Sequence, residues 1–564
     1  MDLLICSALT VLELTSLRSA LEADVPSIFS KFIVVLLLQY VTLKLYRIVL
    51  YPAFFSPLRH LPGPKDNNLF LGQEVNRYRA ESPIGLELEW MREWPNAPFI
   101  RSLTIAGRET LLVNSLGAHK AFLQTHVYDF VKPPFFARMV GEITGKGLLF
   151  AEGDQHRHQR KLLSGPFSVP SIRKIMPVFQ EEAQRLSGVF ESAIGEKPYS
   201  SIEVTNAFSE SFMDTIGIAV LGIRLETLSS IYPLGFQELY NRMLHQEPVG
   251  QLISLVNAFV PIRRFLPLEA NHRFIRAKND LGKMLREIIE KRARELADGT
   301  FRREMGESRD ILTYMLEEAE VQRKETGAEV WTVDDIVGHL LNFTSAGHES
   351  TSTTLVWAVY VLSTKHAIQD KLRAEIQLLL ENNPKPSHDE ISGLPYLNNF
   401  LREVLRLYSP TIMVPRTASR DLLIEGVLIP QGTQVELRGP TIHHHPGVWG
   451  FDSAGTFDPD RFNTDTNTNT NTNTNNSINP YAFEAFLQGP RMCPGRHLAL
   501  AGVKAMLVEL VRRWRFLGVE GVEGVEGGQL LAGGEEEVGR GVRVANPSLT
   551  FRPAGGLRVR FERA

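Results

Sequence analysis

Cys493 is the side chain with the clearest chemical potential in this sequence, because it is the only cysteine in the body of the chain. The other cysteine, Cys6, lies near the N-terminus, so a disulfide framework is excluded and a reducing compartment is expected. Cys493 stands in the run FLQGPRMCPGRHLA, just before a helical pattern that begins at His497. A helix N-terminus and the neighbouring Arg491 and Arg496 both lower the pKa of a thiol. We therefore predict an anionic metal ligand, with an inert buried thiol as the alternative for a lone cysteine.

A long helix predicted from Asp334 to about Lys365 carries a second group of candidate side chains, and Thr332 with Asp335 has the spacing of a capping box at its start. A stripe of small residues lies in its middle: Ala346, Gly347, Ser350, Thr351 and Thr354. A glycine inside a helix costs about 1 kcal/mol relative to alanine, so Gly347 needs a structural reason. The stripe alone fits a flat ligand and close helix packing equally well.

The loop around Cys493 resembles the haem-binding signature of the cytochrome P-450 superfamily, Phe-x-x-Gly-x-Arg-x-Cys-x-Gly-x-x-x-Ala. Its fixed positions are all present: Phe486, Gly489, Arg491, Cys493, Gly495 and Ala499. The resemblance runs from near Leu61 to the C-terminus. It implies a mainly α fold with small β-sheets, built as a single large catalytic domain. It also implies haem b with the Cys493 thiolate as axial ligand and contacts from Phe486, Arg491 and Gly495.

The same resemblance assigns a role in proton delivery to residues of the long helix. Glu349 and Ser350 correspond to the proton-delivery pair of the family, with Thr351 as a possible assistant. Serine stands where threonine is usual, so the hydroxyl lacks the methyl group that fixes its rotamer.

Haem propionate partners are implied in two segments of the chain. Arg160 in GDQHRHQRK is expected to pair with a propionate, and Arg416 is a further candidate. His156 replaces the tryptophan of the family. From the sequence, His156 is as well explained by a solvated surface histidine as by a propionate contact.

Other motifs are expected to be structural. Glu403 and Arg406 are three residues apart and can pair on one helix face, and the resemblance adds Arg461 as their third member. Residues 463–476 form an Asn/Thr repeat, and residues 518–528 a Gly-Val-Glu repeat, which we predict to be surface insertions. A zinc site is not expected in the run 443–445, because consecutive histidines cannot all face one ion.

The N-terminal part of the sequence predicts a membrane anchor. We assign residues 1–27 to a leader, 28–51 to a transmembrane helix, 52–65 to a Pro-rich hinge and 66–564 to the catalytic domain. A buried or interfacial helix is the alternative for the anchor. Lys and Arg residues are more frequent after the span than before it, which predicts a single-pass protein of the endoplasmic reticulum with a cytosolic catalytic domain. The net charge of −3, without a basic stripe, does not indicate nucleic-acid binding.

The resemblance implies a monooxygenase that inserts one oxygen atom of O2 into an apolar organic substrate, which we expect to be a secondary-metabolite intermediate. Electrons are expected from NADPH through a cytochrome P-450 reductase, with cytochrome b5 as an optional second donor. The substrate pocket is expected in the variable segments 128–143 and 240–265, whose side chains are largely apolar. A reductase-independent isomerase or dehydratase and a non-catalytic haem protein are the alternatives. The acid–alcohol pair in the long helix argues against both.

Overall fold

The computed structural model of the chain describes residues 6–11, 13, 25–228, 235–244, 246–301, 309–327, 330–463, 478–521, 542–545 and 550–564. Helices dominate and the strands form small sheets, which confirms the predicted fold class. The Asn/Thr repeat lies outside the described residues from 464 onward, as does the Gly-Val-Glu repeat from 522 onward.

The α-helices of the body follow one another along the whole chain. They are α3 (Glu74–Arg79), α4 (Gly85–Glu93), α5 (Leu116–Lys120), α6 (Pro134–Thr144), α7 (Gly153–Leu162), α8 (Val169–Ile194), α9 (Val204–Ile216), α10 (Phe236–Leu244), α11 (Pro248–Phe259), α12 (Glu269–Ala297), α13 (Ile311–Thr326), α14 (Val333–Thr364), α15 (His366–Asn382), α16 (His388–Ser392), α17 (Pro395–Leu407), α18 (Gly439–His443), α19 (Pro446–Trp449) and α20 (Arg496–Arg513).

The strands form three sheets. The largest has the order β1-β2-β8-β5-β3, with β1 (Phe99–Leu103), β2 (Glu109–Val113), β3 (Phe130–Val131), β5 (Val414–Ala418) and β8 (Gln434–Leu437). The second has the order β4-β10-β9, with β4 (Tyr199–Glu203), β9 (Trp514–Val519) and β10 (Arg558–Arg563), and the third pairs β6 (Leu422–Ile424) with β7 (Val427–Ile429). The predicted surface repeat starts at Gly518, but Gly518 and Val519 belong to strand β9 and pair with β10. Val519 is buried in the core, so the start of the repeat is part of the sheet.

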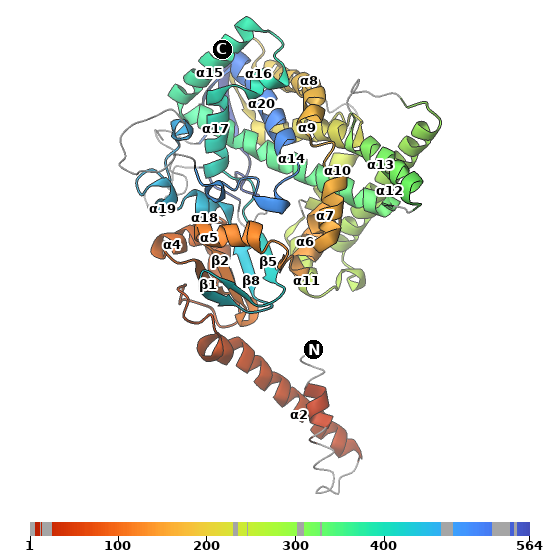
Figure 1. Ribbon diagram of the computed structural model, residues 1–564, viewed down its shortest axis with the longest axis vertical. Helices are drawn as coiled ribbons and strands as arrows, with labels where there is room; N and C mark the ends of the chain where they lie inside the picture. Colours follow the sequence, from red (N-terminus) through yellow and green to blue (C-terminus); the bar gives the residue numbers. More distant parts are fainter. Residues whose placement is uncertain are drawn as a thin grey trace.

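The N-terminal helix is a candidate membrane span that extends away from the body (Figure 1). Helix α2 (Val25–Leu45) continues into a π-helical segment, η1 (Tyr46–Phe55). The helical segment therefore ends at Phe55, four residues beyond the predicted end of the span at residue 51. Residues Phe32–Phe55 have a mean hydropathy of 1.9 and none of their most apolar stretch is buried against the protein. A 24-residue helix covers the ~30 Å hydrocarbon core of a bilayer.

The Pro-rich segment after the anchor packs against the largest sheet. The backbone N–H of Arg101 in β1 donates to the carbonyl of Pro62 at 2.8 Å. A Cβ atom on Gly63 would lie 1.8 Å from the carbonyl oxygen of Arg101, so only glycine allows this approach. The segment is thus held on β1 over part of its predicted hinge.

Helix α14 crosses the body between the largest sheet and helices α8, α15 and α16 (Figure 1). Its bounds confirm the predicted helix to within one residue at each end. The predicted capping box is also present: the Thr332 hydroxyl accepts from the Asp335 N–H at 3.2 Å, and the Thr332 N–H donates to the Asp335 carboxylate at 2.9 Å.

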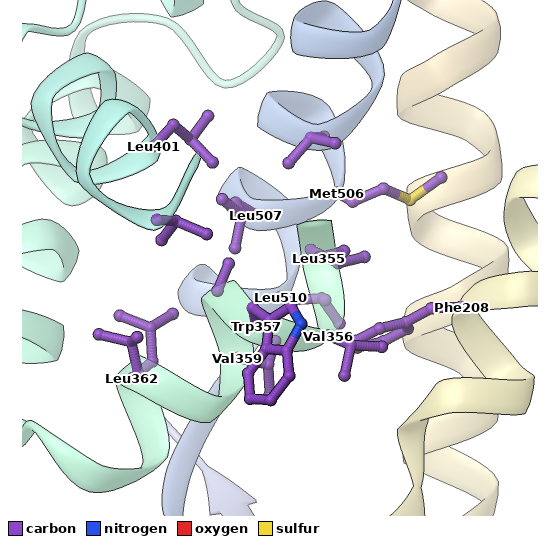
Figure 2. Packing of buried hydrophobic residues seen from close by; sticks show 14 of the residues in the cluster. Phe208, Leu355, Val356, Trp357, Val359, Leu362, Leu401, Met506, Leu507 and Leu510 are labelled. Atoms are coloured by element: carbon purple, nitrogen blue, oxygen red, sulfur yellow. The ribbon is translucent and has the colours of Figure 1, made fainter. Parts of the chain in front are cut away.

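Residues 355–362 in the second half of α14 are apolar on all sides and lie at the centre of the hydrophobic core. Figure 2 shows its residues packed between helices α9, α17 and α20. The labelled side chains are Leu355, Val356, Trp357, Val359 and Leu362 of α14, Phe208 of α9, Leu401 of α17, and Met506, Leu507 and Leu510 of α20. Burial of each large apolar side chain contributes about 1.5–3 kcal/mol, so this packing fixes α14 relative to α20.

The first half of α14 holds the segment between α6 and α7 through two buried side chains. The His339 Nδ1 accepts from the Leu148 N–H at 3.2 Å, and the Asn342 side chain accepts from the Leu149 N–H at 2.9 Å. Because His339 is an acceptor at Nδ1 and is buried, its neutral form is favoured. Burial lowers its pKa to about 4.

This buried histidine predicts an acid-sensitive fold. Between pH 6.5 and about 4 the unfolded state takes up a proton on His339 and the folded state does not, so stability falls as pH is lowered through this range. As the pH is lowered through this range, the free energy of unfolding of the wild type should therefore fall faster than that of His339→Gln. The difference in slope should be about 1 kcal/mol per pH unit. Urea unfolding midpoints at pH 6 and pH 5 measure this difference. Equal slopes for the two proteins would contradict it.

Candidate active site

The Cys493 loop is shaped by a tight turn before α20. The Cys493 N–H donates to the Phe486 carbonyl at 2.9 Å and closes the loop. Gly489 has a φ of +71°, and a Cβ atom there would lie 2.3 Å from the Leu123 carbonyl oxygen, so this position requires glycine. Helix α20 begins at Arg496, one residue before the predicted start. The sulfur is thus presented just ahead of the N-terminus of a helix whose remainder is buried in the core.

Burial raises the pKa of the Cys493 thiol above its ordinary value, so the predicted lowering of this pKa is wrong. A hydrogen bond from the Gly495 N–H and the charges of Arg160 and Arg496 act in the predicted direction, but removal of the sulfur from water outweighs them. A coordinated metal ion deprotonates a thiol outright, so a raised thiol pKa is compatible with a role as metal ligand.

A cluster of buried cations lies next to this loop. Lys132 precedes α6, Arg416 lies in β5 and Arg491 lies in the Cys493 loop. The Lys132 Nζ is 3.1 Å from a carboxylate oxygen of Glu152, and Arg491 also pairs with Glu152. Burial and the charges of Arg416 and Arg491 lower the pKa of Lys132 to about 7, and burial with the charge of Arg491 lowers that of Arg416 to about 10.

His156 belongs to the same cluster, and the surface-histidine interpretation is wrong. His156 is 4% exposed, and its Nδ1 lies 3.1 Å from the Tyr128 hydroxyl. Burial and the charges of Arg491, Lys132 and Arg160 lower its pKa to about 4, so it is neutral at physiological pH. Arg160, on the same helix, is half-buried, and its charge acts to lower the pKa of the Cys493 thiol.

These residues fit a dianionic ligand such as the two propionates of haem. Lys132 and Arg491 both pair with Glu152, whose charge also acts on Arg416, so among the described residues positive charge is in excess at this buried place. Within the described part of the chain the buried Nε of Arg491 has no hydrogen-bond partner. Buried donors are normally satisfied, so an additional acceptor is expected here. The charge of Arg160 acts both on His156 of this cluster and on the Cys493 sulfur.

Lys132 was missed by the sequence interpretation, which assigned its segment to an apolar pocket. The available signal is a single lysine within the apolar run FVKPPFF. We predict that Lys132→Met loses haem about ten- to a hundredfold faster, since a charge-assisted hydrogen bond contributes about 1.5–3 kcal/mol. Transfer of haem to apomyoglobin measures the rate. Lys120→Met, at an exposed position on α5, is the matched control, and equal rates for the two variants would contradict the role of Lys132.

The small residues in the middle of α14 divide into one that serves helix packing and others that lie on a face open to a ligand. A Cβ atom on Gly347 would lie 2.6 Å from the Ile216 Cδ1 of α9, so Gly347 serves close helix packing. Ala346 is exposed and Ser350 is partly exposed, although α14 is largely buried. The face with Ala346 and Ser350 is therefore accessible to a ligand.

The predicted acid–alcohol pair has separate partners in the structure. The Ser350 hydroxyl donates to the Ala346 carbonyl at 2.6 Å, and the Thr351 hydroxyl donates to the Gly347 and His348 carbonyls. Glu349 accepts a hydrogen bond at 2.7 Å from the hydroxyl of Thr550, a residue that the sequence interpretation missed. Both Ser350 and Glu349 remain partly exposed, so they are accessible for proton transfer.

The structure brings Glu403, Arg406 and Arg461 together in a buried network. Arg406 donates two hydrogen bonds to the Glu403 carboxylate, each at 2.8 Å, and Arg461 donates to the same carboxylate at 2.9 Å. Arg406 also donates to the carbonyls of His443, Ala454 and Thr456 at 2.6–3.0 Å. The network ties α17 to the segment that leads to the Cys493 loop.

The histidines of the run 443–445 face different partners. His443 accepts from the Glu484 N–H at 2.8 Å, and the ring of His444 is 2.8 Å from the Pro440 carbonyl. His445 lies 2.9 Å from the Pro95 carbonyl. Across the described ranges of the chain, no group of three or more His, Cys, Asp or Glu residues is arranged to hold a metal ion.

Comparison with solved structures first defines the class of fold. The heme domain of cytochrome P450DA superposes with a TM-score of 0.69, at 20% identity, over 89% of this chain and 98% of the other. At this identity the likeness establishes the fold, a mainly helical body with small sheets.

Sequence comparison then defines the family. The profile of the family described as Cytochrome P450 matches residues 62–526. The chain is 30% identical to cytochrome P450 monooxygenase ALT8 of Alternaria alternata, over 91% of both chains. It is 28% identical to cytochrome P450 monooxygenase sphH of Aspergillus fumigatus, over 84% of this chain and 85% of the relative. The chain belongs to the cytochrome P450 family, which confirms the predicted class of enzyme, a monooxygenase, and implies haem with cysteine-thiolate ligation.

Proposed function

We propose that this protein is a membrane-anchored monooxygenase that holds haem b on the Cys493 sulfur and inserts one oxygen atom of O2 into an apolar organic substrate. The observation that carries the proposal is the placement of Cys493 near a buried cluster of three cations, Lys132, Arg416 and Arg491, whose charge exceeds that of Glu152, their paired carboxylate among the described residues. A thiol and a dianion site together suit haem better than either would alone.

The residues of the cation cluster would hold the propionates. Lys132, Arg416 and Arg491 would each gain a negative partner, which offsets the desolvation that now lowers their pKa values. His156, neutral and hydrogen-bonded to Tyr128, would add a neutral polar contact. Haem bound in this way would supply the reductive activation of dioxygen.

The residues of α14 would handle the protons. Glu349 would hold a proton on its carboxylate and pass it to the Ser350 hydroxyl, which must first turn away from the Ala346 carbonyl. The Thr351 hydroxyl already donates within the helix and is buried, so we assign it a secondary part. The Ser350 hydroxyl rotates more freely than a threonine hydroxyl would at this position. The fraction of electrons lost as hydrogen peroxide should therefore depend on which residue stands here.

The substrate is proposed to be apolar because aromatic side chains gather where α6 meets α11. Phe135 of α6 stacks on Phe259 of α11 with ring centroids 5.5 Å apart, and Phe136 contacts Phe150 at 6.0 Å. We propose a secondary-metabolite intermediate as substrate, a proposal supported by the fungal origin of similar monooxygenases.

Reconstitution tests the proposal. The full-length protein in phospholipid vesicles is combined with NADPH, a fungal NADPH–cytochrome P450 reductase, isotopically labelled dioxygen and an apolar mycelial extract. We expect NADPH- and reductase-dependent dioxygen uptake and one labelled oxygen atom in a product, with cytochrome b5 as an optional second donor. Product formed without NADPH or reductase would instead support an isomerase or dehydratase.

We propose residues 32–55 as the membrane anchor, with the body on the cytosolic side of the endoplasmic reticulum. The exposure of the apolar helix supports the anchor, and the basic residues that follow it support the orientation. Alkaline carbonate extraction of microsomes should leave the protein in the membrane, and protease added to sealed microsomes should degrade the body. A body protected from protease would contradict the orientation.

A further inference from the structure

Thr550 contacts the acid of α14 from a segment near the end of the chain. Its Oγ1 donates to the Glu349 Oε1 at 2.7 Å, although the two residues are 201 positions apart in the sequence. Ser350, the adjacent hydroxyl on α14, donates to the Ala346 carbonyl at 2.6 Å. In this conformation the Glu349 carboxylate is therefore oriented by Thr550.

The segment that carries Thr550 is fixed to the protein on two sides. The backbone of Thr550 forms an antiparallel bridge with Thr411, and the Phe551 N–H donates to the Pro410 carbonyl at 3.1 Å. On the other side, the Trp357 indole of α14 donates to the Phe551 carbonyl at 2.6 Å.

Ring packing makes this attachment rigid. Phe551 stacks on Trp357 with centroids 5.5 Å apart, and Trp357 stacks on Tyr408 at 4.8 Å. All three side chains are at most 2% exposed. Because Trp357 and Glu349 belong to the same helix, the segment binds α14 at two places about two turns apart. The Thr550 hydroxyl is thus held at a fixed position relative to the Glu349 backbone.

We propose that Thr550 is a positioning residue for proton delivery: its hydroxyl keeps the Glu349 carboxylate in one orientation from which it can pass protons toward Ser350. The proposal rests on the function proposed above for Glu349. A glutamate side chain has several rotatable bonds, and it loses this freedom only where a fixed donor holds it. Hydrogen bonds to a carboxylate are also stronger than those between neutral groups, so a single well-placed hydroxyl selects the orientation. Without the donor, the carboxylate spends most of its time in other rotamers.

The test compares three variants of the reconstituted holoenzyme with dioxygen as the only acceptor of NADPH electrons. Thr550→Val keeps the shape of the side chain and removes the donor, whereas Thr550→Ser keeps the donor. In Thr550→Val we expect the share of electrons that reduce dioxygen to water, instead of to hydrogen peroxide, to fall about tenfold. Small misplacements of a reacting group have effects of this size or larger. Thr550→Ser should restore most of the loss. Thr364→Val, the same substitution at the end of α14, is the matched control and should behave as the wild type.

A double variant separates positioning from a general structural effect. In Glu349→Gln, which removes the acid, adding Thr550→Val should cause no further change. A further tenfold loss in the double variant would overturn the proposal, because Thr550 would then act independently of Glu349. If Glu349→Gln raises the peroxide share and Thr550→Val does not, positioning by Thr550 is overturned and the function of Glu349 stands. If Glu349→Gln has no effect, both are overturned.

Crystal structures of the same holoproteins provide a readout that does not depend on turnover. We expect the Glu349 carboxylate within hydrogen-bond distance of residue 550 in the wild type and in Thr550→Ser. In Thr550→Val we expect a different Glu349 rotamer. A Glu349 side chain that keeps its orientation in Thr550→Val would overturn the proposal even if turnover falls.

Discussion

Replacing Arg406 by methionine is expected to abolish accumulation of folded, haem-loaded protein. Arg406 is fully buried and donates to the Glu403 carboxylate and to three backbone carbonyls. Methionine keeps an unbranched apolar stem but has no donor, so these acceptors would lose their partner inside the protein. Breaking a buried ion pair by removing one member costs about 3–5 kcal/mol. That is a large part of the ~5–15 kcal/mol by which proteins are stable.

The measurement is the ratio of haem absorbance to purified protein after expression in parallel. Arg402→Met is the matched control on the same helix, because Arg402 is only half-buried and lies 4.1 Å above the ring of Phe462. A contact of this kind contributes about 0.5–1 kcal/mol at an exposed site, so Arg402→Met should fold and bind haem. Equal haem loading of both variants would contradict the structural role of the Glu403 network.

Replacing Glu349 by glutamine is expected to have the largest effect on turnover among changes that leave haem binding intact. Glutamine is similar in size and can still accept from the Thr550 hydroxyl, but it cannot supply a proton. General acid catalysis contributes about 10²- to 10⁴-fold, so the rate at which electrons reach water or product should fall about a hundredfold.

The assay is the partition of NADPH electrons between hydrogen peroxide and water in the reconstituted holoenzyme. Glu290→Gln, an acid-to-amide change at an exposed position of α12, is the control and should match the wild type. A Glu349→Gln variant with the wild-type partition would show that protons enter by another route.

Features set by neighbours in sequence could be predicted. The start of α14 followed from the capping-box spacing of Thr332 and Asp335, because both partners lie within one turn. The pairing of Glu403 with Arg406 followed from their spacing on one helix face. The loop around Cys493 carries its own turn residues, so its outline was also readable from the sequence.

Features set by distant segments could not be predicted from spacing. The contact of Glu349 with Thr550 joins residues that only the folded core brings together. Lys132 and His156 are buried by elements from elsewhere in the chain, so neither the cation cluster nor the low pKa of His156 is visible locally. The pKa of Cys493 shows the same limit: the local charges were identified correctly, but burial, a property of the whole fold, has the larger effect.

The most direct test of the account is the absorption spectrum of the reduced, CO-bound protein in the wild type and in Cys493→Ala. Thiolate ligation shifts the Soret band of this complex to longer wavelength than ligation by a neutral group. We expect the shifted band in the wild type and its complete loss in Cys493→Ala, with Cys6→Ala unchanged as the control at the other cysteine. A wild type without the shifted band, or a Cys493→Ala variant that keeps it, would contradict the assignment of Cys493 as the haem ligand.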